Sequence, residues 1–77
     1  MKGKNVKILT HPEPKQLKDL RDSVNFTPKQ AGDLLHVNAR TFQRWEKGST
    51  RMPLAYWELF EVKIRVIRNR MVNGVMP

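Results

Sequence analysis

The sequence contains no cysteine, so neither a disulfide nor a thiolate metal site can support the fold or a reaction. Its two histidines, His11 and His36, stand beside no glycine-rich phosphate loop and no pair of carboxylates. No apolar run approaches the roughly 18 residues of a bilayer-spanning helix, and the N-terminal apolar stretch is too short for a signal peptide. We therefore expect a cytoplasmic protein that is not an enzyme, binds no cofactor or metal and does not associate with a membrane.

Basic residues outnumber acidic ones by 15 to 7, which gives a formal net charge of +8 and an isoelectric point near 10.5. Such a balance favours a polyanionic partner, namely DNA, RNA or an anionic membrane surface. A merely solubilising surface is the alternative. At 77 residues the chain is one small domain with a modest core, so a partner subunit can add to its stability.

Residues 27–48 predict two short capped helices joined by a tight turn. Thr27 is suited to cap the first, with Pro28 at the first helical position and Gln30 at the third, as in a capping box. This helix is expected over Pro28–Leu35. Small side chains at positions 31 and 32 would allow the second helix to cross closely.

Asn38 is suited to cap the second helix, expected over Ala39–Lys47, and Gly48 to end it in the left-handed conformation. Between the two helices, His36 occupies a position that usually needs positive φ, which histidine tolerates better than most residues. We interpret it as a turn residue, because a metal site would need further ligands that the sequence lacks.

Two further helices are expected to support this hairpin. One begins at Pro14 or Lys15 and ends at a left-handed Asn25; its inward face is formed by Leu17, Leu20, Arg21 and Val24. The other begins at Pro53 and extends to about Met71. It carries two apolar stripes, the first made by Leu54, Trp57, Phe60 or Glu61, Ile64 and Ile67, and the second by Tyr56, Leu59, Val62 or Lys63, and Val66. The second stripe predicts burial against a C-terminal piece or another subunit.

The run RWEKG at residues 44–48, Phe42 as the central apolar residue, Leu35 with Val37 and Thr41, and Leu20-Arg21-Asp22 resemble the XRE family, the group of lambda repressor and Cro. His36 and Pro28 replace the family's usual glycine and a frequent glutamine. The resemblance implies an all-α, compact four- to five-helix helix-turn-helix domain. Residues 1–12 are then a basic, flexible N-terminal arm, 13–72 the domain (helix-turn-helix 27–48, last helix 53–71) and 73–77 a tail.

A recognition helix enters the major groove by its N-terminal end, so residues near its start and one turn later meet bases. The expected base readers are Asn38, Ala39, Arg40, Gln43 and Arg44; arginine suits guanine and glutamine suits adenine. The expected phosphate contacts are Thr27, Lys29, Lys47, Ser49, Thr50 and Arg51. The resemblance further implies an ion pair between Arg21 and Glu46, and we expect it to fix the angle between their helices. The arm is either disordered or touches DNA.

These features favour a sequence-specific, double-stranded-DNA-binding regulator, most simply a repressor that binds an inverted repeat as a homodimer. The candidate dimer interface consists of Tyr56, Leu59 and Val66. Two alternatives stay open: an antitoxin-like protein that binds a toxin or other protein partner and DNA secondarily, and a charge-driven nonspecific binder. The operator and any effector cannot be deduced from the sequence.

Overall fold

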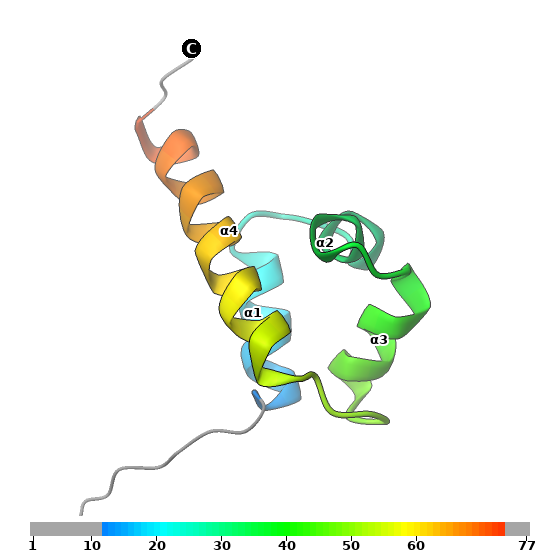
Figure 1. Cartoon of the computed structure of the whole chain (residues 1–77). Helices are drawn as coiled ribbons and strands as arrows, with labels where there is room; N and C mark the ends of the chain where they lie inside the picture. The colour runs from blue at the N-terminus through cyan, green and yellow to red at the C-terminus, as the bar shows by residue number, and fades with distance from the viewer. Residues whose placement is uncertain (1–11, 74–77) are drawn as a thin grey trace, which may run out of the picture.

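The computed structural model describes residues 12–73 and arranges them as four α-helices (Figure 1). The helices are α1 (Pro14–Asp22), α2 (Pro28–Leu35), α3 (Ala39–Lys47) and α4 (Leu54–Asn73). The described part of the chain contains no strand, so the predicted all-α class is confirmed there. None of these four helices combines the length and apolar character that crossing a membrane would require.

Helices α2 and α3 begin at side-chain caps of the predicted kind. The Gln30 backbone N–H donates to Thr27 Oγ1 at 3.1 Å, and Gln30 Oε1 accepts from the Thr27 N–H at 2.8 Å. Asn38 Oδ1 accepts from the Thr41 N–H at 2.8 Å. These bonds satisfy donors that the first turn of a helix leaves without partners, which is why each helix starts where it does.

Three residues of the described chain have positive φ: Asn25 at 59°, His36 at 63° and Gly48 at 79°. All three were predicted to be left-handed, and His36 and Gly48 cap the ends of α2 and α3 as expected. The prediction that Asn25 ends the first helix is wrong: α1 already ends at Asp22 with Ser23 as a right-handed cap, and Asn25 lies in the turn that follows. Within residues 12–73, no group of three or more potential ligands is placed to hold a metal ion.

Other boundaries also differ from the predicted ones. α4 starts at Leu54, because Pro53 lies just ahead of the helix and its carbonyl accepts the first helical hydrogen bonds. At its other end, α4 extends to Asn73. Pro12, assigned to the arm, is buried and lines a surface hollow beside Trp45. The rest of the predicted arm and residues 74–77 of the tail lie outside the described residues.

The core forms where all four helices meet. Its centre is Phe42 of α3, which is fully buried and meets the Phe60 ring of α4 edge-on at a centroid distance of 5.4 Å. Trp45, one turn later, has its ring 5.9 Å from that of Phe42. The buried apolar residues are Leu17, Val24, Ala31, Leu35, Phe42, Trp45, Met52, Trp57, Phe60 and Ile64. The inner face of α3 is thus fixed by aromatic packing.

Gly32 lets the hairpin close tightly. A Cβ atom at this position would lie 2.7 Å from the carbonyl oxygen of Val37 and 3.3 Å from that of Asn38. Both oxygens belong to the turn that leads into α3, and a backbone cannot yield as a side-chain end does. The small residue therefore sets how α2 meets the start of α3.

The Gly32→Ala variant should lose about 1–2 kcal/mol of unfolding free energy, because the backbone clash exceeds the gain in helix propensity. Denaturant unfolding followed by circular dichroism measures the change. Asp33→Ala, at the next and exposed position of α2, is the matched control and should stay within about 0.5 kcal/mol of the parent. A Gly32→Ala variant as stable as the parent would show that the turn has room for a methyl group.

Candidate nucleic-acid interface

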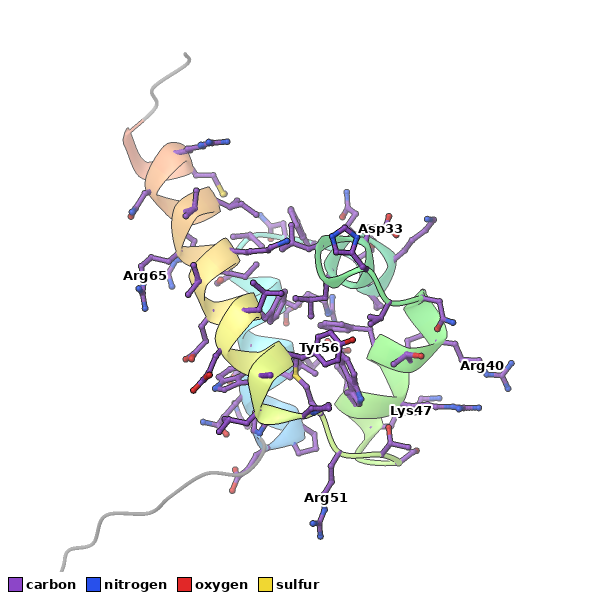
Figure 2. The ribbon with its side chains drawn as sticks, in the orientation of Figure 1. Asp33, Arg40, Lys47, Arg51, Tyr56 and Arg65 are labelled. Carbon is purple, nitrogen blue, oxygen red and sulfur yellow. The ribbon has the colours of Figure 1, made fainter. Side chains whose placement is uncertain are left out.

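Helix α3 has two faces of opposite character. Phe42 and Trp45 lie in the core, whereas Arg40, Gln43 and Arg44 are exposed on the other side. Figure 2 shows the Arg40 and Lys47 side chains extending from α3 away from the rest of the molecule. A face of this kind, with long polar side chains on a rigidly held helix, has the shape and chemistry to approach base edges in a major groove.

The first residues of α3 have less freedom to contact bases than the later ones. Asn38 is exposed, but its side-chain oxygen is engaged by the Thr41 N–H as the cap. Its amide NH₂ group stays accessible for a contact. Ala39 is half-buried and presents only a methyl group. Among the five predicted base readers, Arg40, Gln43 and Arg44 thus have the reach that direct readout requires.

The pair between Arg21 of α1 and Glu46 of α3 is present and bidentate. Arg21 Nε lies 2.5 Å from Glu46 Oε2, and Nη2 lies 3.1 Å from Oε1. The Arg21 Nη1 also donates to the carbonyl oxygen of Phe26 at 2.7 Å. The two side chains are only 12% and 11% exposed, and the hydrogen bond to Glu46 raises the pKa of the Arg21 guanidinium. One guanidinium therefore joins α1, the α1–α2 connection and α3.

This pair also shapes the charge of the interface. Between Asn38 and Pro53 the only acidic residue is Glu46, and its carboxylate faces Arg21. The basic side chains of the same stretch are Arg40, Arg44, Lys47 and Arg51, all exposed. The outer side of α3 and its following loop consequently present positive charge without a free carboxylate, as a DNA-facing surface requires.

The predicted phosphate contacts lie at two places. Thr27 and Lys29 stand at the start of α2, where Thr27 is exposed although its hydroxyl serves the cap, and Lys29 makes only an exposed 3.4 Å pair with Asp33. Such a surface pair is worth little and would yield to a phosphate. Beyond the end of α3, the exposed residues are Lys47, Ser49, Thr50 and Arg51. The two groups flank the outer face of the helix-turn-helix.

Two contacts of α4 near this interface were not predicted. Lys63 Nζ donates to the carbonyl oxygen of Leu34 at 2.8 Å, which satisfies an acceptor at the end of α2. The ring of Tyr56 lies 5.4 Å from that of Trp45, so this residue packs against α3 while 36% of it stays exposed (Figure 2). Arg65 lies on the opposite side of the molecule from Arg40 and is remote from the candidate interface (Figure 2).

No protein-family model matches the chain. Over 53 residues, or 69% of this chain, the sequence is 36% identical to a protein named Type II methyltransferase M.MspI from a Moraxella species. The matching segment makes up 13% of that methyltransferase, so the chain spans only a small part of its relative's length.

Proposed function

We propose that this chain is a sequence-specific, double-stranded-DNA-binding transcriptional regulator, with α3 as the helix that enters the major groove. The observation that carries the proposal is the exposed Arg40, Gln43 and Arg44 face of α3, set on a helix whose other face is fully packed. A fixed helix with a basic, carboxylate-free outer side can hold its side chains in register with base edges. The XRE resemblance of the same residues supports this assignment.

Regulation by repression at an inverted repeat is the most economical form of the proposal. A single nine-residue helix meets too few base pairs to select one site in a genome, and two-fold pairing doubles the number of bases contacted. The segment shared with the methyltransferase makes up 13% of that protein. We therefore take the similarity to be with one small part of the methyltransferase and assign no methyl transfer to this chain.

A second candidate function is the binding of a protein partner, with DNA contact secondary. It is favoured by the exposed apolar side chains of α4, among them Leu59, Val62 and Val66. Such an antitoxin-like protein would be recovered from cells in a fixed ratio with an unrelated chain. A regulator of the first kind would instead be recovered alone or with DNA.

The Arg40→Ala variant tests the proposed role of α3. It should cost about 1–3 kcal/mol of binding on a preferred duplex and far less on random duplexes, because a bidentate base contact is lost. Fluorescence anisotropy on both duplexes at one salt concentration measures the two affinities. The matched control is Lys29→Ala, which should weaken both duplexes alike and lower the salt slope by about one. Equal losses on the two duplexes for Arg40→Ala would remove Arg40 as a base reader.

A further inference from the structure

Helix α4 is apolar on two opposite sides. Trp57, Phe60 and Ile64 are buried in the core. On the side that faces away from the core, Leu59 is 40% exposed, Val62 52% and Val66 45%. An apolar stripe on a helix normally faces a packing partner, and α4 has two such stripes. The exposed apolar side of α4 is therefore a candidate docking surface.

The spacing of the exposed residues indicates what that occupant is. Ala55, Leu59, Val62 and Val66, hereafter the α4 stripe, follow one another at intervals of four, three and four. This is the a and d pattern of a heptad repeat, with Leu59 and Val66 at a positions and the other two at d positions. A seam of this kind pairs with a second helix of the same pattern.

We propose that the α4 stripe pairs with the α4 stripe of a second copy, with the two helices antiparallel. A two-fold axis then makes the interface self-complementary, and each a position faces a d position of the other copy. Leu59 lies against Val62 of the second copy, and Ala55 against its Val66. Tyr56, which the sequence predicts at this interface, contacts Trp45 and lies at the edge of the seam, where 36% of it stays exposed.

Charge selects the antiparallel orientation. The g positions beside the stripe are Glu58 and Arg65, both exposed. In an antiparallel pair g faces g, so each Glu58 meets the Arg65 of the other copy, twice over by symmetry. In a parallel pair Arg65 would face Arg70 across the seam, and this repulsion would offset the attraction between Glu58 and Lys63. The next d position is the polar Asn69, and the antiparallel register places it beyond the partner's helix start at Leu54.

The pairing rests on the proposed function in one respect: the dimer would present two α3 helices, related by a two-fold axis, to DNA. The pairing itself is measured without DNA, by sedimentation equilibrium from micromolar to near-millimolar protein. We expect a monomer–dimer equilibrium, which Val62→Lys abolishes without loss of helix content because Val62 is half exposed in the monomer. Met71→Lys is the matched control: Met71 is 53% exposed on the same helix but off the stripe, and the variant should dimerise like the parent.

A charge-exchange series tests the orientation. Glu58→Arg and Arg65→Glu should each raise the dimer dissociation constant by roughly 2- to 30-fold, since two symmetry-related pairs are lost. The double variant should restore it. Tighter dimerisation of Arg65→Glu alone would indicate a parallel pair and overturn the proposed orientation.

The failure of this inference is distinguishable from failure of the proposed function. A parent protein that stays monomeric throughout, or a Val62→Lys variant that dimerises normally, overturns the α4 pairing even if selective DNA binding is found. A dimer that Val62→Lys disrupts, but that binds all duplexes equally, supports the pairing and contradicts the DNA-reading role.

Discussion

Replacing Phe42 with alanine is expected to lower the free energy of unfolding by about 3–5 kcal/mol. The side chain is fully buried, and its ring contacts both Trp45 of its own helix and Phe60 of α4. Its removal leaves a cavity at the point where α3 is held to the rest of the molecule. A chain of this length has about 4–12 kcal/mol of total stability, so the variant should be largely or wholly unfolded at physiological temperature.

Denaturant unfolding measures this loss, with Trp45 and Trp57 both retained as fluorescent probes. Phe42→Leu keeps most of the buried volume and should lose clearly less than the alanine variant. If Phe42→Ala unfolds at the parent's denaturant concentration, aromatic packing is not what holds α3 in place.

Glu46→Ala should cost about 2–3 kcal/mol, because it leaves the nearly buried guanidinium of Arg21 without its carboxylate. The effect should reach DNA binding as well, since this pair ties α3 to α1 and keeps the only carboxylate between Asn38 and Pro53 occupied. We expect weaker binding to a preferred duplex even at temperatures where the variant is folded.

Two controls separate these effects. Glu46→Gln retains an acceptor for Arg21 without the charge and should lose less stability than the alanine variant. Asp22→Ala removes the longer 3.5 Å contact of Arg21 at an exposed carboxylate and should change stability little. A stable Glu46→Ala variant with unchanged affinity would show that the pair fixes neither the fold nor the angle of α3.

The sequence predicted the local features of this domain well, because short-range chemistry decides them. Thr27 and Asn38 cap helices through atoms three residues away, and the left-handed conformation of Asn25, His36 and Gly48 depends on the residue itself. The start of α1 follows the same logic: Gln16 Oε1 accepts from the Glu13 N–H at 2.8 Å. Gln16 at the third helical position is the sequence signal for this start, although glutamate is a less usual cap residue.

Contacts between helices were harder to foresee. The Arg21–Glu46 pair joins residues 25 positions apart, and only the family resemblance pointed to it. The Lys63–Leu34 hydrogen bond depends on where α4 crosses the end of α2, which no spacing within α4 reveals. Likewise, periodicity grouped Tyr56 with Leu59 and Val66, but the position of α3 places Tyr56 against Trp45. The sequence thus predicted where each helix lies along the chain better than how the helices cross one another.

The candidate interface combines both kinds of information. The choice of Arg40, Gln43 and Arg44 followed from the helical period and from Asn38 as the cap, and the structure places all three on the exposed side of α3. That Glu46 contributes no free negative charge to this side became apparent only from its pairing with Arg21. The electrostatic case for a DNA-facing surface therefore depends on a contact between distant parts of the chain.

The most direct test of the central claim is selection of bound duplexes from a random DNA library by the parent protein at physiological salt. We predict enrichment of one short motif, arranged as an inverted repeat whose half-site spacing reports the separation of two α3 helices. Binding without enrichment of any motif would contradict sequence-specific recognition by α3 and would leave the positive charge as the source of affinity.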